Sequence, residues 1–143
     1  MFKKLLLMIM MFFFAGCQSS ISVPDFDVSF FYLDSCGHCE AFKENAIPYL
    51  EKQFKNSIHI TYYNMDEEAS VAYYHQICDQ LNNYDESLID DVPLFVLDGY
   101  FAVLGYDKGE EKDLAKDIYQ ALNHQPLTRA LELYRWEYKN EEN

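Results

Sequence analysis

The tetrapeptide CGHC at residues 36–39 constrains the fold more than any other feature of the sequence, because of the two segments that flank it. Residues 25–33 (DFDVSFFYL) are aromatic and β-branched with partial alternation, which predicts a buried strand. From residue 36 to about residue 54, apolar positions recur at helical spacing: Cys39, Phe42, Ile47, Leu50 and Phe54. The sequence therefore predicts a cysteine pair at the start of a helix that directly follows a strand.

The patterns that follow alternate between strand and helix. Residues 57–64 (SIHITYYN) predict a second strand. Residues 66–81 predict a second helix, whose acidic first residues suit the positive N-terminal end of a helix. Residues 112–122 carry Leu114, Ile118 and Leu122 at helical spacing and predict a third helix.

Between the second and third of these helices, the sequence predicts a β-hairpin. Residues 94–97 and 100–104 are apolar and flank Asp98-Gly99, a dipeptide that favours a tight turn between antiparallel strands. The expected order of elements is therefore β-α-β-α-β-β-α, which is an α/β fold.

Two prolines modify this order. Pro48 lacks an N–H group inside the first helical pattern, so we expect a kinked or broken helix there. After Pro126, a further helical pattern places four apolar residues on one face: Leu127, Leu131, Tyr134 and Tyr138. Residues 124–143 therefore predict a C-terminal helical tail, and both core packing and partner binding are open roles for it.

The first 17 residues have the layout of an export signal: Lys3 and Lys4, then an apolar run, then Ala-Gly-Cys at residues 15–17. The small residues before Cys17 resemble the lipobox of bacterial lipoproteins, in which the cysteine is lipidated and the peptide is cut before it. An ordinary signal peptide with an incidental Cys17 is the alternative. The resemblance implies a lipid-anchored, extracytoplasmic protein.

If residues 1–17 are removed, residues 18–24 form a tether and residues 25–123 form one domain. The remaining chain carries nine Lys and Arg against 24 Asp and Glu, a formal charge of −15. Such a charge repels phosphate backbones, so nucleic acid is not an expected partner. We expect a monomer.

Three places resemble the thioredoxin superfamily in their order and spacing. The CGHC tetrapeptide after an aromatic strand matches the one in protein disulfide isomerase domains. Residues 91–96 (DVPLFV) are similar to the family's loop and strand that carry a cis-proline, and residues 103–109 (VLGYDKG) are similar to its glycine turn before the last helix. The resemblance covers residues 26–122 and implies a thioredoxin-like fold with a central mixed sheet and flanking helices.

The resemblance also implies a thiol-disulfide oxidoreductase whose redox pair is Cys36 and Cys39, with Gly37 and His38 between them. A thiol attacks as its thiolate, and a helix N-terminus stabilises that anion, so Cys36 is the expected attacking sulfur and Cys39 the resolving one. Stabilising the thiolate makes the disulfide a better oxidant, and His38 adds to this preference for an oxidant or isomerase over a reductase.

The expected partners are client proteins with thiols or disulfides, together with a membrane redox partner. Val92 and Pro93 are the expected client-binding residues: if their peptide bond is cis, the Val92 backbone is free to pair with an extended client segment. A trans proline that starts a strand is the alternative. Exchange of this kind needs no metal and no organic cofactor.

The sequence departs from the family at two positions next to the motif. Phe30 lies six residues before Cys36, where thioredoxins and disulfide isomerases usually keep a buried carboxylate for proton transfer, and Ser35 replaces the customary Trp. Asp34 and Glu40 are the nearby carboxylates that could substitute.

Three alternative interpretations remain open from the residues alone. His75 and Cys78, with Cys36 and Cys39, would make a Cys3His zinc set. The pair at residues 36–39 could instead be a structural disulfide in a non-catalytic binding module. Cys78 is expected to be a buried apolar residue, with a regulatory or intermolecular thiol as the alternative.

Overall fold

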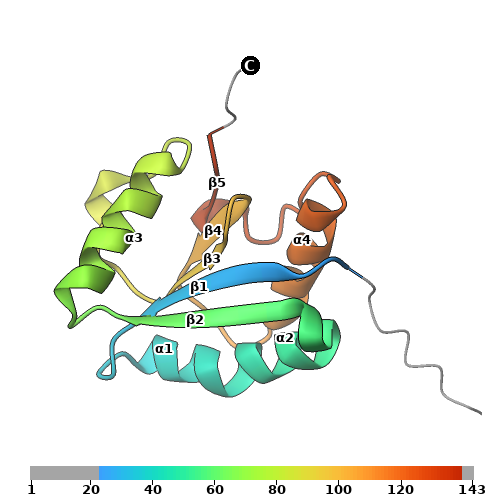
Figure 1. Cartoon of the computed structure of the whole chain (residues 1–143), viewed down its shortest axis with the longest axis horizontal. Coiled ribbons are helices and arrows are strands. Elements are labelled where there is room, and N and C mark those ends of the chain that lie inside the picture. The colour runs from blue at the N-terminus through green and yellow to red at the C-terminus, as the bar shows by residue number, and fades with distance from the viewer. Residues whose placement is uncertain (1–22, 140–143) are drawn as a thin grey trace, which may run out of the picture.

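The computed structural model of the chain describes residues 23–139. The expected signal at residues 1–17, its lipidation at Cys17 and most of the tether at residues 18–24 lie outside the described residues. Residues 23–139 form an α/β fold built on a five-stranded mixed sheet (Figure 1). None of the helices within this range combines the length and apolar character that crossing a bilayer requires.

The observed elements follow the predicted order up to the last helix. The strands are β1 (Phe26–Tyr32), β2 (Ile58–Asn64), β3 (Leu94–Leu97), β4 (Phe101–Leu104) and β5 (Arg135–Glu137). The α-helices are α1 (Gly37–Ala41), α2 (Ile47–Phe54), α3 (Glu68–Gln80) and α4 (Glu111–Leu122).

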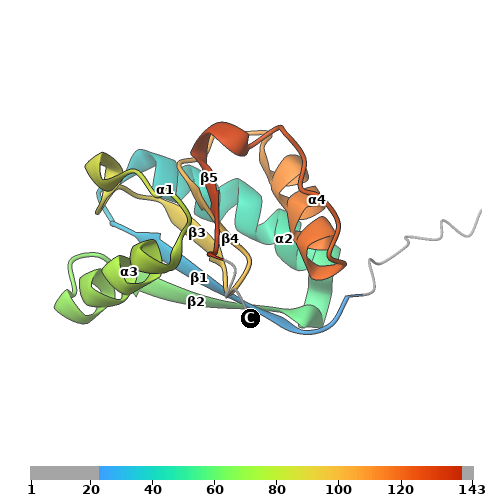
Figure 2. The same ribbon diagram turned by 90° about the horizontal axis from the view of Figure 1, so that it is seen from above.

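The strands are ordered β2-β1-β3-β4-β5 across the sheet. β1 pairs with β2 in parallel and with β3 antiparallel, and the remaining pairs are antiparallel. Viewed from above, α3 lies on one side of the sheet, while α1, α2 and α4 lie on the other (Figure 2). The interior strand β1 is therefore covered on both faces.

Period-two alternation along β1 sends its side chains into two separate cores. Phe26, Val28 and Phe30 pack into the core that contains Leu50 of α2 and Ile118 of α4. The next residue, Phe31, belongs to the opposite core with residues of α3. Successive side chains of a strand point to opposite faces, so β1 contributes to both cores, as expected for a buried strand. Its polar residues are Asp27, which is exposed, and Ser29, which is buried.

The first helical pattern is broken near Pro48. α1 and α2 are joined by a π-helical stretch, Phe42–Ala46, so that the whole segment from Gly37 to Phe54 is helical. Pro48 follows directly in the first turn of α2. Because proline cannot donate a backbone hydrogen bond, the α-helical ladder is interrupted at this point, which confirms the expected break.

The hairpin is also confirmed. β3 and β4 pair antiparallel with Leu97 opposite Phe101, and the Tyr100 N–H donates to the Leu97 carbonyl oxygen at 2.9 Å. Gly99 takes a φ of +81°, a conformation that side chains rarely adopt.

The expected helical tail at residues 124–143 is wrong for its described part. Residues 135–137 form strand β5, which pairs with β4, and Glu132–Tyr134 form a single 3-10 turn. The helical spacing of apolar residues is overridden because the edge of β4 gains backbone partners, and because Trp136 packs on Tyr84 with ring centroids 4.7 Å apart. The tail does pack against the core, but as a strand.

A buried ion pair fixes the segment that leads into β5. The Asp117 side chain on α4 is fully buried and lies 2.5 Å from Nη1 of Arg135. The same carboxylate accepts the Thr128 N–H at 2.8 Å, and the Arg135 guanidinium donates to the Thr128 carbonyl oxygen at 2.8 Å. Each buried charge is thus paired and hydrogen-bonded, as burial of charge requires.

Replacing Arg135 by Ala should leave the Asp117 carboxylate buried without its partner. We expect the free energy of unfolding to fall by about 3 kcal/mol, a typical cost for breaking a buried pair from one side. Urea denaturation measures the change. The matched control is Arg129→Ala, which removes an exposed pair with Glu132 and should leave stability nearly unchanged. Equal effects of the two substitutions would contradict the assigned role of Asp117.

Candidate active site

The cysteine pair lies at the start of α1, immediately after β1. Cys36 is the N-cap residue, with extended backbone angles, and Cys39 lies in the first turn. Their Cα atoms are 5.2 Å apart and their sulfurs are at disulfide-bonding distance. Cys36 is partly exposed, whereas Cys39 is fully buried. A molecule arriving from solvent therefore reaches the Cys36 sulfur first.

The backbone of the helix donates directly to the Cys36 sulfur. The Cys39 N–H lies 3.1 Å from Cys36 Sγ, so the sulfur occupies the position of an N-cap acceptor. Free N–H groups and the helix dipole both favour negative charge at this end of a helix. When the disulfide is reduced, the same geometry stabilises a thiolate on Cys36 relative to its thiol.

The loop before β3 lies against this sulfur. The Val92–Pro93 peptide bond is cis, as expected, and the Val92 carbonyl oxygen is 3.7 Å from Cys36 Sγ. The Pro93 carbonyl accepts the Gly105 N–H at 2.8 Å, which ties the loop to the end of β4. The structure thus brings Cys36 next to Val92, which lies 56 residues further along the chain and directly before Pro93.

His38 is exposed, and its ring forms a hydrogen bond with the turn that follows β4. Its Nδ1 lies 3.0 Å from the Tyr106 carbonyl oxygen. Because a carbonyl oxygen can only accept, the proton of this bond is on Nδ1. His38 thus connects α1 to the turn after β4.

Gly37 is the first residue of α1 and is exposed. A Cβ built at this position would meet no heavy atom within 4 Å. Packing within the described residues therefore does not require glycine here, and the open space lies directly beside Cys36.

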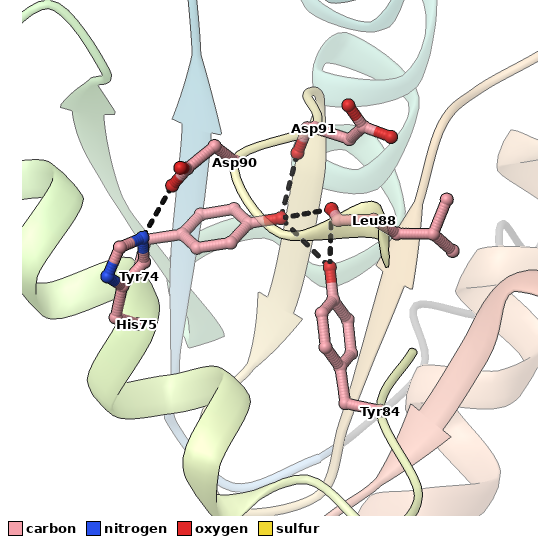
Figure 3. Close-up of polar contacts among 6 residues, drawn as sticks. All are labelled: Tyr74, His75, Tyr84, Leu88, Asp90 and Asp91. Atoms are coloured by element: carbon pink, nitrogen blue, oxygen red, sulfur yellow. Dashed lines mark hydrogen bonds and ion pairs between the residues drawn. The ribbon is translucent and has the colours of Figure 1, made fainter. Parts of the chain in front are cut away.

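Hydrogen bonds from two tyrosines hold the loop that leads to Val92 (Figure 3). The hydroxyl of Tyr74, a fully buried residue of α3, donates to the Asp91 carbonyl oxygen at 2.9 Å and lies 2.9 Å from the Tyr84 hydroxyl. The Tyr84 hydroxyl donates to the Leu88 carbonyl oxygen at 3.1 Å. Burial raises the pKa of both phenols, so they remain hydrogen-bond donors at all physiological pH values.

A second contact between α3 and this loop is also visible in Figure 3, where Nε2 of His75 lies 2.6 Å from Oδ1 of Asp90. Sequence reasoning did not single out Tyr74, Tyr84 or Tyr106. In a chain with 12 tyrosines, no local signal separates those that anchor a loop from those that only pack.

Cys78 is buried in α3, as expected for an apolar core residue. Burial raises the pKa of its thiol to about 11, so it is protonated near neutral pH. A protonated, buried thiol is a poor nucleophile. Cys78 is therefore a poor candidate for thiol exchange near neutral pH.

Phe30, which lies six residues before Cys36, packs inside the core. It is fully buried and its ring stacks on Phe42 with centroids 4.7 Å apart. Asp34 and Glu40, the possible substitutes, are both exposed, and the Glu40 carboxylate pairs with Lys43. Neither carboxylate is buried, in contrast to Cys39.

The alternative zinc set is not assembled in residues 23–139. In this part of the chain, no group of three or more His, Cys, Asp or Glu side chains is close enough to hold a metal ion. His75 contacts Asp90, and Cys78 is buried in the α3 core.

The chain was compared with protein-family models, with curated proteins and with solved structures, and none of them matches. The interpretation of the site therefore depends on its own geometry.

Replacing Tyr74 by Phe keeps the ring and removes the hydroxyl that holds the Asp91 carbonyl. We expect the free energy of unfolding to fall by about 1–2 kcal/mol, because a buried acceptor loses its donor. We also expect amide hydrogens of residues 82–92 to exchange faster with solvent. Urea denaturation and hydrogen exchange measure the two effects.

Tyr73→Phe is the matched control for this substitution. Tyr73 is the neighbouring residue of α3, and its ring packs on Phe31 and Tyr63. Removing the Tyr73 hydroxyl should leave both the free energy of unfolding and the rates of hydrogen exchange nearly unchanged. Equal responses of the two variants would mean that the tyrosine hydrogen bonds do not fix the loop.

Proposed function

We propose that the protein is a thiol-disulfide oxidoreductase with a thioredoxin-like fold, acting through Cys36 and Cys39. The observation that carries the proposal is the Cys39 N–H donating to a partly exposed Cys36 sulfur at a helix N-terminus. This is the environment that makes a cysteine thiol acidic and reactive. A cysteine pair that served only to cross-link the chain would have no need of it.

The proposed reaction is a pair of balanced exchange steps. The Cys36 thiolate attacks one sulfur of a client disulfide, forming a mixed disulfide and releasing the other client sulfur as a thiolate. The Cys39 thiolate then attacks Cys36 Sγ, which releases the second client sulfur and closes the Cys36–Cys39 disulfide. The client gains two electrons and the protein loses two; in the reverse direction, the protein oxidises a client dithiol.

The arrangement of elements supports the thioredoxin-like fold. A strand, the cysteine motif, a helix, a strand and a helix precede an X-Pro bond, a hairpin and a helix, in the order of that superfamily. The cis bond at Pro93 and its position beside Cys36 add a second point of agreement. The strand β5 is an addition to this arrangement.

We further propose that the protein is anchored outside the cytoplasm by lipid on Cys17. The lipobox-like residues 15–17 support this location, and an oxidising compartment suits a redox-active pair. Clients would then be exported proteins with thiols or disulfides, and a membrane dithiol or disulfide carrier would restore the pair. Oxidation or isomerisation is favoured over reduction, because a stabilised thiolate makes the disulfide a stronger oxidant.

One observation favours a second candidate function, a binding module with a structural disulfide. Phe30 fills the position of the family's proton-transferring carboxylate, and the two candidate replacements, Asp34 and Glu40, are both exposed while Cys39 is fully buried. Such a site would hold a disulfide without turning it over. Activity measurements on cysteine variants distinguish the two functions.

Refolding of a scrambled disulfide protein and reduction of insulin test the proposed function. Cys36→Ser should lower both rates by at least about 100-fold, because no thiolate remains to attack the client. Cys39→Ser should accumulate a mixed disulfide with the client, visible by mass spectrometry, because the resolving sulfur is missing. Cys78→Ser is the control and should keep the rates of the unmodified protein. An inactive protein with all cysteines present would favour the binding module.

A further inference from the structure

A pocket of about 460 Å³ opens beside the cysteine motif. At one end it is lined by His38 and by Val92, whose carbonyl oxygen is 3.7 Å from Cys36 Sγ. At the other end it is lined by residues 130, 131, 133 and 134 of the C-terminal segment. The segment that departed from the predicted helix thus builds one wall of a pocket next to the reactive sulfur.

This wall presents unusually exposed apolar side chains. Leu133 is 81% exposed and Tyr134 is 58% exposed, the two highest values among the large hydrophobic residues that the structure describes. Leu131 of the same wall is buried at 7% exposure and anchors the segment to the core. Large apolar side chains grouped at the rim of a pocket are typical of a surface that binds a partner.

Contacts with α4 fix the position of the wall. Thr128 lies two residues before the wall and Arg135 follows it directly, and both contact the buried carboxylate of Asp117. Leu133 and Tyr134 are therefore exposed on a segment whose two ends are fixed to α4. A preorganised apolar wall of this kind costs little ordering entropy when a ligand binds.

The carboxylates among the other lining residues give the pocket a negative charge. Asp91, Asp107 and Glu110 line it, and no Lys or Arg does. Asp91 and Asp107 are exposed, so their carboxylates are free to meet a cationic side chain at the rim. A second copy of this chain, with a net charge of −13, is a poor electrostatic match.

We propose that this pocket binds the client segment that flanks the reactive cysteine, and that it selects extended segments with a large apolar side chain next to a Lys or Arg. Leu133 and Tyr134 contact the apolar side chain, and Asp91 and Asp107 attract the cation. The proposal rests on the proposed function for the identity of the ligand as a client polypeptide. The wall at residues 130–134 then determines which clients are bound.

Binding of cysteine-free peptides to the whole chain tests the pocket apart from any redox step. Three fluorescein-labelled eight-residue peptides carry Ser in place of Cys. The first peptide contains Leu, Phe and two Lys. In the second, the Glu peptide, both Lys are replaced by Glu, and in the third the Leu and Phe are replaced by Ser. Measured by fluorescence anisotropy, the first peptide should bind at least about tenfold more tightly than either of the other two peptides. Its affinity should fall as salt is raised.

Matched variants locate the binding site. The double variant Leu133→Ser, Tyr134→Ser should weaken binding of the first peptide by about tenfold, since it removes exposed side chains without opening the core. Asp91→Asn with Asp107→Asn should reduce its preference over the Glu peptide. Tyr119→Ser and Glu51→Gln change an exposed tyrosine and an exposed carboxylate outside the pocket, and should have no effect. Equal binding of all three peptides, or dimerisation in place of peptide binding, would overturn the proposal.

A redox measurement separates failure of this proposal from failure of the proposed function. The same peptides are made again with Cys in place of Ser, and each cysteine is joined to glutathione as a mixed disulfide. The reduced protein is then given either these peptides or glutathione disulfide as its substrate. The pocket proposal predicts that Leu133→Ser, Tyr134→Ser raises KM for the Lys peptide and leaves the rate with glutathione disulfide unchanged. A protein that reacts with glutathione disulfide but not selectively with peptides refutes the pocket, whereas no reaction with either substrate refutes the oxidoreductase.

Discussion

The hydrogen bond from the Cys39 N–H to the Cys36 sulfur is the interaction on which the account of this site depends. It requires that Cys36 cap α1 shortly after β1 ends at Tyr32, with extended backbone angles at the cap and helical ones directly after it. It also requires that the helix continue far enough to be stable, which the segment from Gly37 to Phe54 achieves despite Pro48. The sulfur is then held where backbone donors and the helix dipole favour an anion.

The rest of the molecule supports that arrangement by fixing two loops against it. On one side of the sheet, the Tyr74 hydroxyl holds the loop before Val92, whose carbonyl oxygen lies 3.7 Å from the Cys36 sulfur. On the other side, the turn after β4 accepts a hydrogen bond from His38. Both loops extend from the apolar strands β3 and β4, which lie deep in the two cores. Chemistry at the helix end thus depends on packing across the whole sheet.

The parts of the fold that could be predicted from the sequence were those with a strong local pattern. The apolar strand before the cysteines, the break near Pro48 and the hairpin at Gly99 follow from residues that lie next to one another in the chain. Strand β5 could not be predicted from neighbouring residues, because its conformation depends on the edge of β4 and on the buried carboxylate of Asp117 on α4. The roles of Tyr74 and of Leu133 at the pocket likewise depend on distant contacts that no local periodicity reveals.

The most direct test of the central claim is the pH dependence of alkylation of the Cys36 thiol in the reduced protein. Iodoacetamide modification at each pH, with the labelled cysteine identified by peptide mass spectrometry, gives the pKa of that one sulfur while buried Cys78 serves as an internal reference. We expect the Cys36 pKa to lie below that of a free cysteine, because the helix N-terminus stabilises the thiolate. A value at or above about 8.5, that of a free cysteine, would contradict it.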